Sequence, residues 1–359
     1  MAKIISMFNH KGGVSKTTTT FHLGWKIAEL GKKVLIIDAD PQCNLTGLTL
    51  GIADYDTLFR FYDSKSNNDL FTSLAPVFGL DRSGTNQIRS FDTNKTSNPN
   101  LNILAGHIRL SELDIQLATA ITSSSTLPAL RQFIGAFYEL INRAAIKDGA
   151  DIVLIDMSPS ISAINMCLMM SSDYFIIPTS PDFYCYQAID SLSDVLPSWA
   201  ERMQGFKNGE LLPVKNPQLL GIISQNYRVY TTDKREDNSQ RTMSASFQKW
   251  ADKIRDITNE KLVPKLQKKQ MVIPKEIFQR FVSYEEPYYL AKIQDFNSLM
   301  PISQKLSKPI FNLTEKEVGQ GAIWSRIQNG KETGQRVAIE EANQVYTKMA
   351  NAILGIIAC

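Results

Sequence analysis

Two lysines and a hydroxyl group stand close together near the start of the chain, at a spacing that suits phosphate binding. The run from Lys11 to Thr18 reads Lys-Gly-Gly-Val-Ser-Lys-Thr-Thr. A loop of this composition can point backbone N–H groups at an anion, and a helix that follows adds its positive end. Lys16 would then reach the β- and γ-phosphates of a nucleotide, and Thr17 would ligate Mg²⁺. The predicted cradle comprises Lys11, Gly12, Gly13, Val14, Ser15, Lys16, Thr17 and Thr18.

The loop departs from the strict phosphate-loop pattern GxxxxGK[ST]. His10 stands in place of the first glycine and Ser15 in place of the second. If the loop requires a backbone conformation that only glycine adopts at no cost, Ser15 costs about 1 kcal/mol and slows turnover. Two alternatives stay open: a glycine turn without a nucleotide, and a scaffold that binds a nucleotide without hydrolysing it.

Carboxylates follow two apolar runs further along the chain. Asp38 and Asp40 close the run that begins at Lys33, and Asp156 closes the run that begins at Asp151. A carboxylate at a strand end can orient an attacking water or hold water around magnesium. We assign Asp40 to the water and Asp38 and Asp156 to the magnesium site; the roles of Asp38 and Asp40 can be exchanged. The alternative is that these carboxylates cap helices.

The elements that must position these groups alternate between strand and helix. An apolar strand at 3–8, a helix at 16–30 closed by Gly31 and a strand at 33–38 form one βαβ unit. Further strands are predicted at 151–156, 174–177 and 219–224, with helices at 129–145, 186–203 and 337–357. This alternation predicts an α/β fold with a doubly wound, mostly parallel sheet.

Two polar segments interrupt the alternation. Residues 51–100 are rich in Ser, Asn, Asp and Thr, and residues 227–294 are polar and charged, with a helix predicted at 242–257. We interpret both segments as surface insertions in a single domain that spans 1–359.

Three motifs together resemble the ParA/MinD family. The run 11–18 is similar to the deviant Walker A loop KGGxGKTT, with serine at the second glycine. Asp38-Ala39-Asp40-Pro41-Gln42 resembles the second box of that family, DxDPQ, and the strand that ends at Asp156 resembles a Walker B box. The resemblance covers most of the chain except the two insertions. It implies a P-loop ATPase that uses ATP and Mg²⁺, similar to ParA-like partition and positioning ATPases.

The resemblance also implies roles for individual residues. In the family, the lysine that corresponds to Lys11 crosses a dimer interface to the phosphates bound by the partner subunit, which predicts an ATP-bound homodimer. Asn226 stands where relatives contact the adenine edge, and Asp295 opens a second loop on the adenine side. The alternative for Asn226 is that its side chain caps a turn.

The partners that the resemblance implies are non-specific DNA and a ParB-like or adaptor protein that stimulates hydrolysis. The cargo is a plasmid, a chromosome or a protein body. The formal net charge of +3 does not by itself indicate nucleic acid. The candidate DNA contacts would bind phosphates, or else form a solvated charged face; they are Lys265, Lys268, Lys269, Arg326, Lys331, Arg336 and Lys348.

Composition and pattern weigh against other classes of protein. Four cysteines without CxxC spacing and a phosphate loop within the first twenty residues favour a reduced cytoplasmic location. The resemblance implies nucleoid association when ATP is bound. A MinD-like membrane role is disfavoured, because residues 345–358 are mostly apolar with only Lys348 charged. An iron–sulfur reductase is rejected, because Met157 and Ser158 stand where a shared cysteine is needed. A metabolic kinase or synthetase would need a substrate pocket that the sequence does not reveal.

Overall fold

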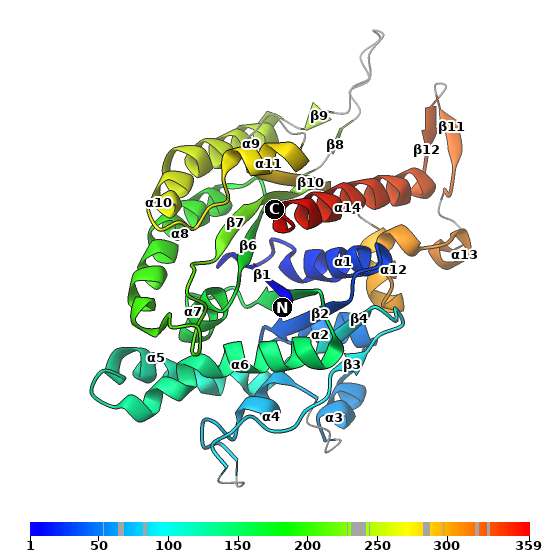
Figure 1. The fold of residues 1–359 in the computed structure, drawn as a ribbon. Helices are drawn as coiled ribbons and strands as arrows, with labels where there is room; N and C mark the ends of the chain where they lie inside the picture. Colours follow the sequence, from blue (N-terminus) through cyan, green and yellow to red (C-terminus); the bar gives the residue numbers. More distant parts are fainter. Residues whose placement is uncertain are drawn as a thin grey trace.

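An eight-stranded sheet forms the centre of the computed structural model (Figure 1). The structure describes residues 1–52, 54–63, 68–81, 85–227, 229–230, 242–243, 245–282, 288–296, 298–319, 323–328 and 331–359. In spatial order the strands are β10 (Tyr289–Gln294), β7 (Gln218–Tyr227), β6 (Tyr174–Thr179), β1 (Lys3–Met7), β5 (Ile152–Met157), β2 (Val34–Ala39), β4 (Leu101–Leu104) and β3 (Asn94–Lys95). Every pairing in this sheet is parallel except that of β3 with β4. The predicted mostly parallel α/β sheet is confirmed.

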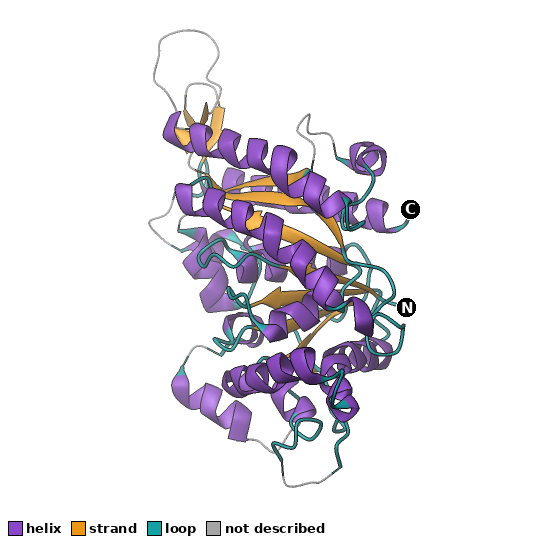
Figure 2. Cartoon of the chain, turned by 90° about the vertical axis from the view of Figure 1, so that its left-hand side faces the viewer, coloured by secondary structure: helices purple, strands orange, loops and turns teal. Residues whose placement is uncertain are grey.

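Helices cover the sheet, which Figure 2 shows running between them. The connection from β1 to β2 crosses the sheet in one direction, whereas those from β5 to β6 and from β6 to β7 cross it in the other. Because such crossovers are right-handed, helix α1 lies on the face opposite to α7 and α8. The helices are α1 (Lys16–Glu29), α2 (Asn44–Leu50), α3 (Tyr55–Asp63), α4 (Leu70–Leu74), α5 (Leu113–Ser123), α6 (Arg131–Asp148), α7 (Ala163–Met170), α8 (Phe183–Arg202), α9 (Ala245–Ile257), α10 (Val263–Gln267), α11 (Lys275–Phe281), α12 (Leu299–Leu306), α13 (Glu315–Val318) and α14 (Gln335–Ile357).

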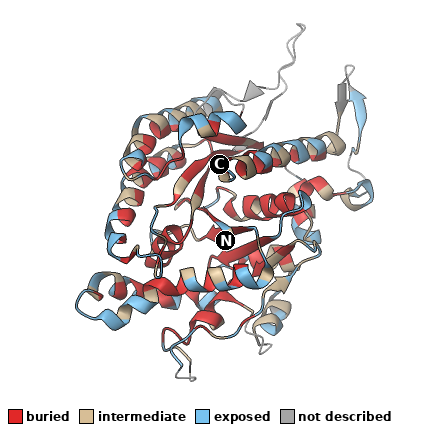
Figure 3. Ribbon diagram, viewed as in Figure 1, coloured by how far each residue is buried: buried red, intermediate tan, exposed pale blue. Residues whose placement is uncertain are grey.

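The central strands are apolar because both of their faces are covered. All six residues of β2 and all six of β5 are buried, and Figure 3 shows the buried sheet between half-exposed helices. Strands buried on both faces need continuous apolar runs rather than alternation. Asp38 and Asp156 are the exceptions in these two strands, and both lie at the carboxyl ends, where a doubly wound sheet presents its ligand site.

The predicted helix at 242–257 begins later than expected. Thr242–Met243 forms strand β9, which pairs with β8 (Val229–Tyr230), and α9 begins at Ala245. A one-turn π-helix at Thr258–Leu262, termed η4, continues α9 into α10. Pro264, the second residue of α10, has no backbone N–H, which removes one helical hydrogen bond at this junction.

Both segments predicted to be surface insertions contain regular structure. Residues 51–100 hold α3, α4 and β3, and α4 packs against α6. Residues 227–294 supply α9, α10, α11 and the edge strand β10 of the central sheet. Apolar residues at the start of β10, Tyr289, Leu290 and Ala291, are buried in the core. The second segment is therefore part of the central architecture and not only a surface addition.

The remaining regular elements lie at the edges of the molecule. A two-stranded ribbon of β11 (Arg326–Gln328) and β12 (Lys331–Thr333) leads into α14, and 3₁₀ turns occur at Ile108–Glu112 (η1), Pro128–Leu130 (η2), Gln204–Phe206 (η3) and Ile310–Asn312 (η5). Within the described part of the chain, none of the helices combines the length and apolarity needed to cross a bilayer.

Candidate functional site

The loop between β1 and α1 is anchored by Asn9. The Asn9 side chain is fully buried; its Nδ2 donates to the carbonyl of Pro178 in β6 at 2.8 Å, and its Oδ1 accepts from the backbone N–H of Lys11 at 3.0 Å. The loop is thus held against the carboxyl end of the neighbouring strand. The sequence analysis did not single out Asn9, because its partner lies 169 residues away.

Two residues of the loop adopt the left-handed backbone conformation. Gly13 has φ 74° and Ser15 has φ 57°. This conformation costs a non-glycine residue about 1 kcal/mol, so the expected expense of serine at position 15 is present in the structure. A Cβ added at Gly12 or Gly13 would meet no described atom within 4 Å, which leaves space beside the loop for a ligand.

Lys16, Thr17 and Asp156 converge behind this loop. Lys16 is 7% exposed, and its Nζ donates to the carbonyl of Lys11 at 3.3 Å. Thr17 Oγ1 donates to Asp156 Oδ2 at 2.6 Å, which joins the first turn of α1 to the end of β5. Burial lowers the pKa of Lys16, and the nearby Asp156 and Asp40 partly offset this effect.

Asp156 is a buried carboxyl group with one oxygen free to bind a cation. Its Oδ1 is buried without a hydrogen-bond partner among the described residues. Burial raises the pKa of Asp156 to about 8, and repulsion from Asp38 and Asp40 contributes. The described residues contain no ready-made cage of three His, Cys, Asp or Glu side chains. The oxygen atoms of Thr17 and Asp156 suit Mg²⁺, which takes one or two protein oxygens and completes its shell with water and substrate phosphates.

Asp38 and Asp40 shape the loop that follows β2. Asp38 is fully buried; its Oδ2 accepts from the N–H and Oγ1 of Thr46 at 2.8 and 2.7 Å, and its Oδ1 accepts from the N–H of Asp40 at 3.2 Å. Burial raises the pKa of Asp38 to about 6, an effect that the hydrogen bonds from Thr46 oppose. Asp40 uses Oδ1 to accept from the N–H of Gln42 at 3.0 Å.

Gly106 explains how Asp38 fits beneath this loop. A Cβ at Gly106 would lie 2.9 Å from Asp38 Cγ, closer than real Cβ contacts allow. Gly106 also donates its N–H to Thr46 Oγ1 at 2.8 Å, the hydroxyl that bonds Asp38. Gly106, which follows strand β4, therefore supports the carboxylate loop from the strand next to β2.

Lys11 points to a residue that the sequence analysis missed. Its Nζ forms an ion pair with Asp182 Oδ2 at 2.6 Å, within the same subunit. Asp182 precedes α8, and its Oδ1 caps that helix by accepting from the N–H of Cys185 at 2.9 Å. An acidic residue just before a helical run is a recognisable N-cap signal, but its pairing with Lys11 depends on the tertiary fold.

The two predicted adenine contacts lie at the ends of adjacent strands. Asn226 is the second-last residue of β7, and Asp295 directly follows β10. The two strands are paired, and their register places Gln294 opposite Tyr227. The side chain of Asn226 lies outside the described residues. Gln225, which was not predicted, donates its Nε2 to Thr19 Oγ1 and so links β7 to α1.

The predicted DNA contacts are not gathered on one face of the subunit. Lys265, Lys268 and Lys269 lie at α10, whereas Arg326 lies in the β11–β12 ribbon, on the opposite side of Figure 1. Several of these cations are already paired: Lys265 with Asp194, Lys269 with Glu201 at 2.7 Å, and Arg336 with Glu340 at 3.0 Å. Lys268 and Lys348 are exposed, and the side chain of Lys331 lies outside the described residues. A single basic patch formed by all seven residues is therefore not present in one subunit.

Comparisons with known proteins agree with this geometry. The family model AAA_31, described as an AAA domain, matches residues 2–206, more than half of the chain. The sporulation initiation inhibitor protein Soj of Bacillus subtilis is 29% identical over 192 residues, which cover 54% of this chain and 64% of Soj. The chromosome partitioning protein ParA of Caulobacter vibrioides is 26% identical over 255 residues, 71% of this chain and 79% of ParA. The match thus spans less than two thirds of Soj.

Solved structures of McdA from Cyanothece share the fold. Apo McdA superposes with a TM-score of 0.54 at 15% identity, covering 95% of this chain and 99% of McdA. The McdA(D38A)–ATP complex gives a TM-score of 0.53 at 14% identity, covering 96% and 97%. The matched family model, the similar Soj and ParA sequences and the shared fold lead to one conclusion: the chain belongs to the AAA_31 family of AAA domains and is a ParA/MinD-type ATPase.

Proposed function

We propose that this chain is an ATP-dependent dimerising ATPase that positions a plasmid, a chromosome or a protein body by nucleotide-dependent, non-specific DNA binding. A partner protein stimulates its hydrolysis. The observation that carries the proposal is the placement of two lysines on one loop. Lys16 is buried beside Thr17 and Asp156. The side chain of Lys11 is 22% exposed, and its ion pair with Asp182 can be exchanged for a contact with phosphate.

The loop supplies what the triphosphate of ATP requires. The loop leaves space at Gly12 and Gly13 directly before the positive end of α1, where backbone N–H groups would bind phosphate, and Lys16 adds a full charge. Thr17, with Asp156 behind it, would hold Mg²⁺, which would supply positive charge against the phosphates. A nucleotide at this site is also supported by McdA(D38A), a protein of the same fold solved as an ATP complex.

Hydrolysis is assigned to the loop after β2. Asp40 orients the attacking water, because its hydrogen bond to Gln42 uses Oδ1 and leaves the second carboxylate oxygen available within the described structure. Both carboxylate oxygens of Asp38 already accept hydrogen bonds from Thr46 and Asp40. We therefore assign Asp38 to fixing the position of this loop next to the magnesium site. The partner protein accelerates the step by fixing the loop in its reactive arrangement.

Dimerisation follows from Lys11. On ATP binding, Lys11 leaves Asp182 and contacts the phosphates held by the partner subunit, which closes two subunits around two nucleotides. The dimer doubles the basic surface that each subunit offers to DNA, and such contacts to phosphates carry no sequence information. The protein is then cytoplasmic, and associated with the nucleoid when it is bound to ATP. The names of Soj and ParA, which refer to sporulation and chromosome partitioning, support a positioning role.

One alternative is an ATP-binding scaffold with little turnover, and Ser15 favours it. The left-handed backbone at Ser15 makes the loop costlier to hold than one with glycine, which would slow hydrolysis more than binding. Comparison of ATP affinity with the rate of phosphate release in the presence of DNA separates the two functions.

A MinD-like membrane role finds less support. The apolar residues near the end of α14, including Ala352, Ile353 and Ile356, are buried against the body of the protein. They are therefore unavailable to a bilayer unless the helix undocks.

Light scattering tests the proposal with ATP, with ADP and without nucleotide. The wild-type chain should be dimeric only with ATP and Mg²⁺. Lys16→Ala should lose ATP binding, whereas Lys11→Ala should keep ATP binding and remain monomeric. A Lys11→Ala protein that dimerises as the wild type does would overturn the assignment.

A further inference from the structure

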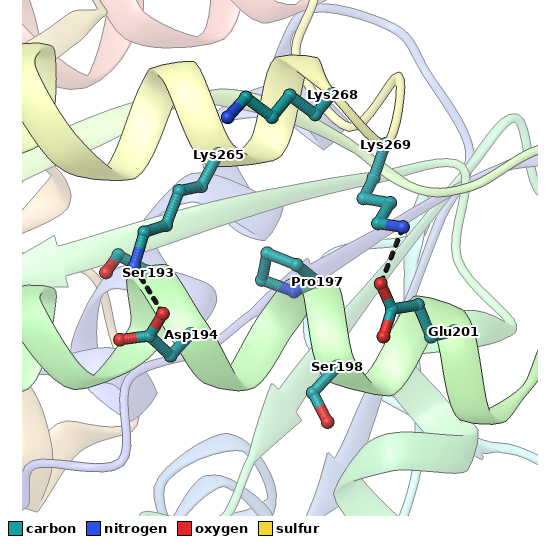
Figure 4. Close-up of a pocket in the computed structure, with 8 residues that line it drawn as sticks. All are labelled: Ser193, Asp194, Pro197, Ser198, Glu201, Lys265, Lys268 and Lys269. Atoms are coloured by element: carbon teal, nitrogen blue, oxygen red, sulfur yellow. Dashed lines mark hydrogen bonds and ion pairs between the residues drawn. The ribbon is translucent and has the colours of Figure 1, made fainter.

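A ladder of opposite charges joins α8 to the η4–α10 segment. The lysine row comprises Lys261, Lys265, Lys268 and Lys269, and the acidic stripe comprises Asp190, Asp194 and Glu201 on α8. Lys261 pairs with Asp190, Lys265 with Asp194, and Lys269 with Glu201 at 2.7 Å. Figure 4 shows Lys265 and Lys269 reaching across to the two α8 carboxylates.

The spacing of the lysine row lets it act as one surface. Lys261 lies in the η4 turn, Lys265 in α10 and Lys269 just after α10. Their ion pairs with three carboxylates of the single helix α8 place all three lysines along the same side of this segment. A DNA duplex offers one negative charge per ~1.7 Å of its axis. A lysine row of this length therefore meets phosphates in any register, which suits binding without sequence preference.

A hollow of about 230 Å³ separates the two helices at this place. Pro197, with its compact ring, lies at the bottom between Asp194 and Glu201, and the lysines stand above it (Figure 4). Lys268 is exposed and forms no ion pair with any residue in the described part of the chain. Lys268 therefore offers a cation to the surroundings while Lys265 and Lys269 are turned toward α8.

We propose that the lysine row is a DNA-contact surface and that Asp194 and Glu201 mask it, holding two of its cations until DNA phosphates displace the carboxylates. The inference rests on the DNA binding in the proposed function and deepens it by naming the surface and its restraint. It explains why a row of lysines lies opposite α8 carboxylates that neutralise most of its charge.

The exposure of the paired groups makes the mask reversible. The side chains of Lys265 and Lys269 are 35% and 34% exposed, and those of Asp194 and Glu201 are 67% and 63% exposed. Ion pairs at such exposure are weak and are screened by salt. A polyanion that brings many phosphates can therefore replace the carboxylates, whereas a single small anion cannot.

The mask also provides a threshold for DNA binding. A single subunit presents Lys268 with its neighbours paired, which holds DNA poorly. Two subunits joined by ATP present two rows to one duplex, and the second row binds at a high effective concentration. Weak rows that act only in pairs make DNA binding depend on the dimer.

Fluorescence anisotropy of a labelled random-sequence duplex tests the mask, with the full-length chain, ATP and Mg²⁺ at several salt concentrations. Asp194→Asn with Glu201→Gln removes the two charges and keeps the shapes of the side chains. This variant should bind DNA about five- to twenty-fold more tightly at ~0.1 M salt, with a salt slope steeper by up to about 2. Adding Lys265→Ala and Lys269→Ala to it should cancel the gain.

A matched control changes the net charge equally elsewhere. Glu112→Gln with Glu139→Gln removes the carboxylates of the ion pairs with Arg109 and Arg143, on η1 and α6. If the control tightens DNA binding as much as the Asp194/Glu201 variant, or if that variant binds as the wild type does, the mask is refuted and the proposed function stands. If neither the wild type nor any variant binds DNA with ATP, the DNA binding in the proposed function is refuted. Thermal melts establish that each variant is folded.

Discussion

Lys11 Nζ lies 2.6 Å from Asp182 Oδ2, and the two residues belong to the same subunit. The lysine that we propose to cross the dimer interface therefore forms an ion pair within its own subunit. Asp182 also caps α8, so release of Lys11 and the start of that helix are coupled through one carboxylate. Dimerisation must include the cost of breaking this pair.

Asp182→Asn should strengthen dimerisation with ATP. The amide keeps the N-cap of α8 but loses the charge that holds Lys11. Because the pair is partly exposed, its loss is worth about 1 kcal/mol or less in each subunit. Each dimer breaks two such pairs, so the dimer dissociation constant should fall by up to about thirty-fold. Sedimentation equilibrium with ATP and Mg²⁺ measures this constant. A weaker dimer would show that Asp182 assists dimerisation instead of restraining it.

The matched variant Asp182→Ala separates the charge from the cap. It loses both functions, so it should release Lys11 as Asp182→Asn does and also cost about 1 kcal/mol of stability. Equal melting temperatures for the two variants would contradict the capping role seen in the hydrogen bond to Cys185.

Ser15→Gly should relieve strain in the phosphate loop. The backbone at position 15 has φ 57°, and glycine adopts this conformation without the clash of a Cβ. The unfolded chain gains freedom with glycine, so the net increase in the free energy of unfolding is up to about 1 kcal/mol, measured by urea titration. Ser15→Ala keeps the Cβ and should give no increase. If alanine stabilises as much as glycine, the hydroxyl and not the backbone is responsible.

The start of the chain could be predicted because its signals are local. Apolar strand, glycine-bearing loop and helix follow one another in thirty residues, and the observed β1 and α1 begin at Lys3 and Lys16 as expected. Thr17 and Asp156 were assigned to one metal site from motif order alone, and the structure places their side chains in contact.

Features that depend on distant contacts could not be predicted in the same way. Strand β10 was assigned to a polar insertion because its short apolar run becomes a strand only beside β7. The charges of Lys265 and Lys269 suggested free cations, since the sequence does not show that α8 supplies their counter-ions. The pair of Lys11 with Asp182 joins residues 171 positions apart, so no local pattern reveals it.

His22 should make the protein sensitive to acid. In the buried ring, Nδ1 donates to the carbonyl of Thr18 at 2.8 Å and Nε2 accepts from the N–H of Ile310 at 3.1 Å, so the neutral form is required. Burial lowers the pKa of His22 to about 4, against about 6.5 in the unfolded chain. The unfolded state binds the proton more readily, so stability falls as pH drops from 6.5 toward 4, by about 3 kcal/mol in total.

Urea titrations at pH 7 and pH 5 of the wild type and of His22→Gln test this contribution. Asp38 and Asp156 have raised pKa values and act in the opposite direction, gaining stability as pH falls, so only the difference between the two proteins isolates His22. The variant should lose less stability than the wild type between these pH values. Parallel losses would mean that folding does not lower the pKa of His22.

Asp156→Asn should weaken the binding of ATP with Mg²⁺ and increase the stability of the folded protein. Burial among like charges raises the pKa of the native carboxyl to about 8, so its charge costs stability progressively as the pH rises from about 4, where the carboxyl ionises in the unfolded chain, to about 8. Asparagine removes that charge and can still accept from Thr17, which should stabilise the nucleotide-free protein by about 1–3 kcal/mol at pH 9. Thermal melts measure the gain. The affinity for ATP with Mg²⁺, measured by calorimetry, should fall at least about ten-fold.

The carboxylate control is Asp92→Asn, at an exposed ion pair with Lys147 far along the chain. This variant should change neither the stability at pH 9 nor the ATP affinity. If Asp156→Asn behaves like it in both assays, Asp156 is not part of the nucleotide site.

The most direct measurement of the central claim is a crystal structure of the wild-type chain with Mg²⁺ and a non-hydrolysable ATP analogue. We expect two chains around two nucleotides, with each Lys11 withdrawn from Asp182 and bonded to the phosphates held by the opposite chain. A nucleotide bound at Lys16 while Lys11 remains on Asp182, in a lone subunit, would contradict the account.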